Sequence, residues 1–131
     1  MKNKSKGFTV IELIFIIIVF GLASILFFVQ KNNIEVIAQN NTKKTAINSM
    51  YYSLEEVFYP ANKYYPRTID STNLYSVEPS LFTDPNGVKL GTAESAYTYS
   101  ATDCNENKCK SYTLKSTLEK EADYIKTNKN K

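Results

Sequence analysis

The chain has 131 residues, of which 43% are hydrophobic, and it contains no histidine and no tryptophan. Histidine is the commonest general base and a common metal ligand, so its absence argues against an enzyme. The formal net charge is +3, but Lys2, Lys4 and Lys6 all precede Gly7. Without these three lysines, 13 basic residues balance 13 acidic ones. A neutral body lacks the field that attracts nucleic-acid phosphates, and no direct nucleic-acid binding is predicted.

The first element is an apolar segment, because residues 8–29 read FTVIELIFIIIVFGLASILFFV and carry one charged residue, Glu12. About 20 apolar residues span a bilayer core as a helix. Lysines before such a span keep the N-terminus in the cytoplasm, which predicts a single-pass membrane protein with an extracytoplasmic head. A cleaved signal peptide is the alternative. Gly21 and Ala23 could mimic its cleavage site, but the apolar run continues to Val29, which disfavours cleavage there.

Glu12 is unusual because an acidic side chain within a membrane helix costs free energy. Residues 6–13 read KGFTVIEL and follow a lysine-rich start. This string resembles the processing site of type IV pilins and type II secretion pseudopilins: a basic leader, Gly, Phe, Thr, two apolar residues and Glu. Every position of that pattern is met. The resemblance implies a filament subunit made as a precursor, with residues 1–7 as its leader.

The resemblance also implies roles for individual residues. A prepilin peptidase would cut after Gly7 and methylate the new amino terminus on Phe8. Glycine suits this position because a β-carbon would obstruct a narrow protease groove. The cut leaves an amine on Phe8, one helical turn before Glu12. In the family this glutamate meets the amine of a neighbouring subunit, so Glu12, with Thr9 beside it, is the predicted register of assembly.

A single long helix is predicted from about Phe8 to Phe58, because no proline occurs before Pro60, which should end it. Residues 8–29 form its membrane or filament-core part, and residues 30–59 an amphipathic continuation. The continuation carries apolar residues at three- and four-residue spacing, which predicts packing against the chain's own head: Ile47, Met50, Tyr51, Leu54, Val57 and Phe58.

The stretch between the membrane part and this apolar stripe is expected to differ. Ile34, Ile37 and Ala38 point roughly the opposite way from the stripe, so this section is predicted to face other subunits. Residues 40–44 are polar all round. The alternative is a kinked helix without such a division of faces.

Helix flexibility is a further expectation. Pilins often have a glycine at the position of Gly21 and a proline at that of Val29, where the helix can melt in the filament. This chain has the glycine alone. Glycine weakens a helix by about 1 kcal/mol relative to alanine, which predicts a soft spot at Gly21.

Residues 60–131 are predicted to form a loop followed by an antiparallel sheet, which gives an α+β class and, by the resemblance, the type IV pilin fold. The order of these segments is similar to that of small pilins and major pseudopilins. Residues 97–102 alternate, and facing Cys104 with Cys109 pairs Ala101 with Tyr112 and Tyr99 with Leu114. A weaker strand is expected near residues 123–127, and turns at residues 64–66 and 84–87.

Cys104 and Cys109 could form a disulfide, remain thiols or hold half a metal site. No histidine or third cysteine completes a zinc shell, and an exported head lies in an oxidising compartment, so a disulfide is predicted. Some pseudopilins bind calcium near the C-terminus. Here Glu119, Glu121 and Asp123 lie among lysines without a glycine-shaped loop, so no metal or other cofactor is expected.

The predicted function is a subunit of an extracellular type IV pilus serving adhesion, twitching motility or DNA uptake. Its implied partners are further copies of the chain in a helical filament, the prepilin peptidase, an inner-membrane assembly platform and minor pilins. A pseudopilin of a secretion or competence system is the alternative, since it shares every residue used so far. A membrane-tethered binding module that uses the ten tyrosines is a third hypothesis.

Overall fold

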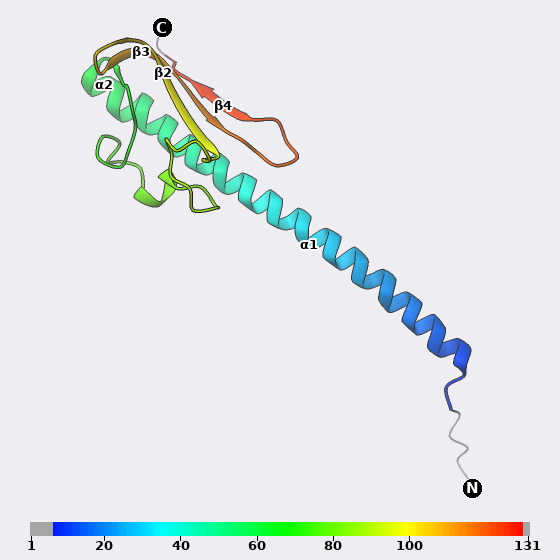
Figure 1. The fold of residues 1–131 in the computed structure, drawn as a ribbon. Coiled ribbons are helices and arrows are strands. Elements are labelled where there is room, and N and C mark those ends of the chain that lie inside the picture. The colour runs from blue at the N-terminus through cyan, green and yellow to red at the C-terminus, as the bar shows by residue number, and fades with distance from the viewer. Residues whose placement is uncertain (1–6, 130–131) are drawn as a thin grey trace. The chain divides into compact units, whose positions relative to one another are not determined.

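The computed structural model describes residues 7–129 and divides into two compact units, one that reaches Ile37 and one that begins at Ala38. The remaining residues, 1–6 and 130–131, lie outside this described part. They include most of the predicted leader, with its three lysines, and the end of the predicted head. Figure 1 shows the order of the elements along the chain.

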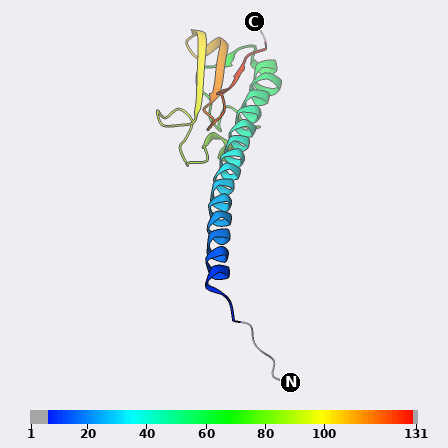
Figure 2. The same ribbon diagram turned by 90° about the vertical axis from the view of Figure 1, so that its right-hand side faces the viewer.

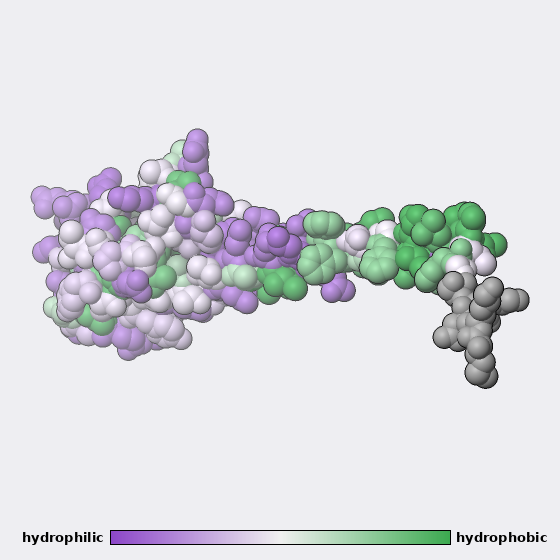
Figure 3. Space-filling view, turned by 90° about the horizontal axis from the view of Figure 1, so that it is seen from below, coloured by the Kyte–Doolittle hydropathy of each residue, from purple (hydrophilic) through white to green (hydrophobic). Residues whose placement is uncertain are grey.

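The first unit is formed by the beginning of α1, a helix over Val10–Tyr52. Every side chain over residues 8–29 is exposed, and Figure 3 shows this stretch as a mostly hydrophobic surface. The chain has one helix near its N-terminus that is long and apolar enough to cross a membrane. An exposed apolar surface of this size is typical of a segment that a membrane or another protein covers.

The second unit is an α+β layer in which the end of α1 packs on a small antiparallel sheet (Figure 2). The predicted apolar stripe forms its core: Ile47, Met50 and Leu54 are fully buried, together with Tyr112 and Leu114 from the sheet. Burying an aliphatic or aromatic side chain contributes about 1.5 to 3 kcal/mol. The expected α+β class and the packing of the helix on the sheet are thus confirmed.

The prediction that Pro60 ends the helix is wrong. After α1 the chain makes a π-helical turn, η1 (Ser53–Phe58), and a further α-helical turn, α2 (Tyr59–Asn62). The N–H of Tyr59 donates to the carbonyl of Leu54, five residues back, and Pro60 then lies in the first turn of α2. Pro60 has no N–H to donate, and it follows this wider turn without interrupting the helical backbone. Lys63, with φ of 63°, ends the helix in the left-handed conformation.

The sheet has four antiparallel strands: β1 (Tyr65–Pro66), β2 (Tyr97–Asn105), β3 (Lys108–Ser116) and β4 (Tyr124–Thr127). β3 pairs with all three others. The predicted register is confirmed, since Ala101 pairs with Tyr112 and Tyr99 with Leu114. The weaker strand expected near residues 123–127 is confirmed as β4.

A two-residue strand was not predicted. Residues 64–66 read as a turn, but Tyr65 and Pro66 form β1, and Tyr65 is fully buried opposite Cys109. A short 3-10 helix, η2 (Pro79–Phe82), follows in the loop that leads to β2.

The turn predicted at residues 84–87 is confirmed, and Asp84 organises it from a buried position. Its carboxylate accepts hydrogen bonds of 2.9 Å from the backbone N–H groups of Asn86, Val88 and Ala96. Burial alone would raise the pKa of this carboxyl. The three hydrogen bonds outweigh burial, so the pKa of Asp84 lies below its ordinary value.

Candidate functional site

The start of α1 brings Thr9 and Glu12 together. The N–H and the hydroxyl of Thr9 each donate to Oε2 of Glu12 at 2.9 Å. The N–H of Glu12 donates back to the Thr9 hydroxyl at 3.4 Å. Because α1 begins at Val10, Thr9 is the N-cap residue and Glu12 the third helical residue. This reciprocal pair is a capping box.

The capping box gives Glu12 a second role that the sequence reasoning missed. A threonine followed three residues later by glutamate, just before an apolar run, is a known sign of a helix start and could have been recognised. Among the described residues, Oε2 accepts both bonds from Thr9 and none is seen at Oε1. Capping therefore leaves one carboxylate oxygen of Glu12 open to another donor.

The surroundings of Glu12 are apolar. It shares a shallow hollow with Phe8, Ile11, Phe15 and Ile16, all of which are exposed. Once such a surface is covered by lipid or protein, a carboxylate within it is unfavourable unless a cation approaches it. The site is therefore suited to pairing with a positive group.

Gly7 and Phe8, the residues of the predicted cleavage point, lie just before the helix. A β-carbon at Gly7 would contact nothing in the chain. The packing of the described residues therefore does not require glycine here. Phe8 is 76% exposed, which leaves the preceding peptide bond accessible.

At Gly21, the predicted soft spot, α1 continues without a break. A β-carbon there would also contact nothing. Nearby, the hydroxyl of Ser24 donates to the carbonyl of Phe20 at 2.8 Å, a bond that slightly weakens a helix. Melting near Gly21 stays a prediction.

Residues 40–44 of α1 are polar on every side, but they are not all exposed. Asn40 and Lys43 are buried. The side-chain amide of Asn40 donates to the carbonyl of Glu119 at 2.8 Å and accepts from its N–H at 3.1 Å. Lys44 pairs with Glu121. These contacts tie the end of α1 to the segment before β4.

A second buried polar cluster was missed as well. Glu55, on η1, accepts hydrogen bonds from the hydroxyl groups of Tyr65, at 3.1 Å, and Tyr112, at 2.8 Å. The backbone N–H of Lys129 donates to it at 3.3 Å. Burial raises the pKa of Tyr112, and its hydrogen bond to Glu55 raises it further. The cluster joins η1, β1, β3 and the C-terminal segment.

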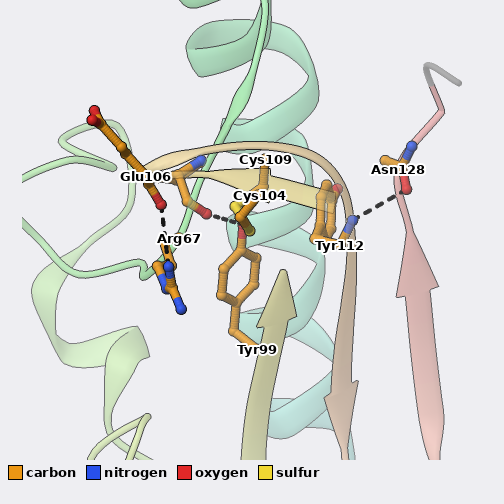
Figure 4. Close-up of a disulfide and its surroundings, with 8 residues drawn as sticks. Arg67, Tyr99, Cys104, Glu106, Cys109, Tyr112 and Asn128 are labelled. Atoms are coloured by element: carbon orange, nitrogen blue, oxygen red, sulfur yellow. Dashed lines mark hydrogen bonds between the residues drawn. A yellow bond between two sulfur atoms is a disulfide. The ribbon is translucent and has the colours of Figure 1, made fainter. Parts of the chain in front are cut away.

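The predicted disulfide is confirmed and links Cys104 to Cys109 across the β2–β3 hairpin (Figure 4). The hydroxyl of Tyr99 donates to the carbonyl of Pro66 at 2.7 Å. Arg67 donates to the carbonyl of Glu106 at 3.3 Å, as the dashed line in Figure 4 shows. The tip of the hairpin is thus held both covalently and by the β1 segment.

Residues 7–129 contain no group of three or more Cys, Asp or Glu side chains placed to hold a metal ion. Comparison of the chain with family models, curated proteins and solved structures gave no match. Function is therefore inferred from the residues and geometry of this chain.

Proposed function

We propose that the chain is a filament subunit of the type IV pilin class. The observation that carries this proposal is the string at residues 6–13, placed immediately before an exposed apolar helix. Gly7 and Phe8 lie outside the helix, as a protease substrate requires, and α1 begins two residues after Phe8. The role is structural, with no catalytic step.

In this proposal the apolar part of α1 serves first as a membrane anchor and then as the filament core. The precursor is held in the membrane with its head extracytoplasmic, and assembly moves the subunit into an extracellular pilus. The exposed apolar surface over residues 8–29 supports both uses, because lipid and neighbouring helices can each cover it.

Glu12 sets the stagger of subunits in this proposal. Cleavage after Gly7 creates an amine on Phe8, and the open Oε1 of Glu12 can accept it from a neighbouring subunit while Oε2 remains with Thr9. A buried charge without a partner costs several kcal/mol, about 3 to 5 when one partner of a pair is removed. Only subunits at the right stagger satisfy every carboxylate and every amine.

Mass spectrometry of the native protein tests the class. We expect a mature chain that starts at methylated Phe8. A Gly7→Val variant should accumulate as the uncut precursor, because the β-branched side chain blocks the protease groove. Gly21→Ala is the matched control and should be cut normally, since its added β-carbon meets nothing. A native chain that retains residues 1–7, or one cut near Ala23, would overturn the proposal.

Shearing of cells then separates a pilus from a pseudopilus. Long released filaments made chiefly of this chain identify a pilus, whereas processed protein without filaments at native expression identifies a pseudopilin. A native chain that retains residues 1–7, forms no filaments and still binds a ligand tightly would instead favour the membrane-tethered module.

A further inference from the structure

A groove of about 400 Å³ lies on the second unit, where the end of the helix meets the tip of the hairpin. Tyr59, Lys63 and Tyr64 line it from the helical side. Asp103, Lys108 and Lys110 line it from β2 and β3. Its volume lies within the range of small-molecule sites, about 300 to 1,000 Å³. We refer to it as the lysine groove.

The charge of the lysine groove is unbalanced. Lys63, Lys108 and Lys110 face one acidic residue, Asp103. In the part of the chain that the structure describes, none of these three lysines forms an ion pair, whereas four other lysines do. Like charges gathered in one groove repel each other, and a bound anion relieves that repulsion.

Two of the lysines lie side by side on one strand, and all three are exposed. Lys108 and Lys110 are two residues apart on β3, so both project from the same face of the strand. The ammonium of Lys108 lies 5.3 Å from the centre of the Tyr64 ring, within the range of a cation–π contact. The disulfide at Cys109, between the two lysines, constrains the backbone that carries them. This order in the backbone and at Lys108 lowers the entropy lost when a ligand binds.

Two residues of the groove have a left-handed backbone, Lys63 (φ of 63°) and Asp103 (φ of 54°). Lys63 takes this conformation because it ends α2, and its backbone thereby turns from the helix toward β1.

The groups in the lysine groove match one ligand chemistry. Ammonium groups bind an anion, and the Asp103 carboxylate accepts hydrogen bonds from hydroxyl groups. We propose that the groove binds an acidic saccharide, a carbohydrate that carries both carboxylates and hydroxyl groups. A nucleic-acid strand fits less well, because the chain after Gly7 is neutral and lacks the broad positive field that a run of phosphates requires.

The probe is a trimer of galacturonic acid, and its fully methyl-esterified form is the control, with the same rings but no charge. Titration calorimetry uses the full chain, unassembled, in non-ionic detergent micelles. We expect the acid trimer to bind and the ester to bind at least about tenfold more weakly. Added salt should weaken the binding of the acid trimer. Equal binding of acid and ester, or no binding of the acid, would overturn the proposal.

Variants locate the site. Lys108→Gln with Lys110→Gln should weaken binding at least about tenfold, as the loss of charge-assisted hydrogen bonds predicts. Lys89→Gln removes one exposed charge outside the groove and should leave affinity unchanged. Lys63→Gln provides an independent test if the double variant unfolds, which circular dichroism detects. Equal losses in Lys89→Gln and the groove variants would show a non-specific charge effect and contradict the proposal.

Oligothymidylate is titrated in parallel. If it binds more tightly than the trimer and depends on the same lysines, the ligand class is wrong and the groove is a nucleic-acid site. Because the chain is unassembled in this experiment, a negative result leaves the proposed filament role untouched, and failure of assembly leaves saccharide binding untouched.

Discussion

Glu55 is a carboxylate buried in the second unit, at 4% exposure. A buried charge is tolerated when hydrogen bonds replace the water it has lost. Here the two tyrosine hydroxyl groups and the N–H of Lys129 supply them from three separate segments. The neighbouring Glu56 is exposed and pairs with the Lys129 side chain. Two adjacent glutamates therefore bind Lys129. Glu55 accepts from its backbone N–H in the interior, and Glu56 pairs with its side chain at the surface.

We predict that Glu55→Ala lowers the free energy of unfolding by about 3 kcal/mol, because two buried tyrosine hydroxyl groups lose their acceptor. Glu56→Ala is the matched control and should cost less than about 1 kcal/mol, as a surface ion pair does. The measurement is urea unfolding of the full chain in micelles, followed by the near-ultraviolet circular dichroism of its tyrosines. Equal losses in the free energy of unfolding for the two variants would show that the buried cluster contributes no more to stability than a surface ion pair.

At the scale of residues, the sequence predicted the disulfide but not the Glu55 cluster. The chain was expected to be exported, and it has two cysteines and no histidine, so few alternatives to a Cys104–Cys109 disulfide remained. Glu55 looks like an ordinary exposed helical glutamate in the sequence. Its burial depends on η1, where Ser53, Leu54 and Glu55 are buried in succession. A π-helix has more residues per turn than an α-helix, so an α-helical period cannot predict this pattern.

At the scale of elements, the β2–β3 hairpin was predictable because its information is local. Alternating residues define its two faces, and the cysteines fix its register, which the structure confirms. β1 was missed because a two-residue strand forms only where β3 offers an unpaired edge. The helix end was missed because the effect of Pro60 depends on the hydrogen bonds of the preceding turn.

Removal of the disulfide should destabilise this hairpin. Closing so short a loop contributes about 2 kcal/mol in the loop-entropy account. We therefore predict that Cys104→Ser with Cys109→Ser lowers the melting temperature of the second unit by about 10 °C. A reductant should lower the melting temperature of the natural chain to a similar extent and leave that of the variant unchanged. A variant that melts like the oxidised natural chain would contradict this contribution.

At the scale of the whole molecule, Glu12 connects the fold of one chain to the proposed filament. Its hydrogen bonds with Thr9 cap the start of α1, and they leave Oε1 open among exposed apolar side chains. The sequence pointed to Glu12 through the motif and through the cost of a charge in an apolar run. It could not show which of the two roles matters, because a helix cap and a subunit contact use the same carboxylate.

Substitution by glutamine separates these two roles. Glutamine also serves at the third position of a capping box, so Glu12→Gln should retain the helix start but lose the charge. We predict that Glu12→Gln and Glu12→Ala both keep the cut after Gly7 and both reduce incorporation into sheared filaments at least about tenfold, as an unpaired buried amine implies.

Glu35→Gln is the control for loss of charge on the same helix, because Glu35 is exposed and its ion pair with Lys31, at 3.8 Å, is of the weak surface kind. It should assemble normally. Normal assembly of Glu12→Gln together with failure of Glu12→Ala would assign Glu12 to capping and remove the register role. If both Glu12 variants fail while Glu35→Gln assembles, the charge itself is required, as expected when one subunit's carboxylate must meet another subunit's amine.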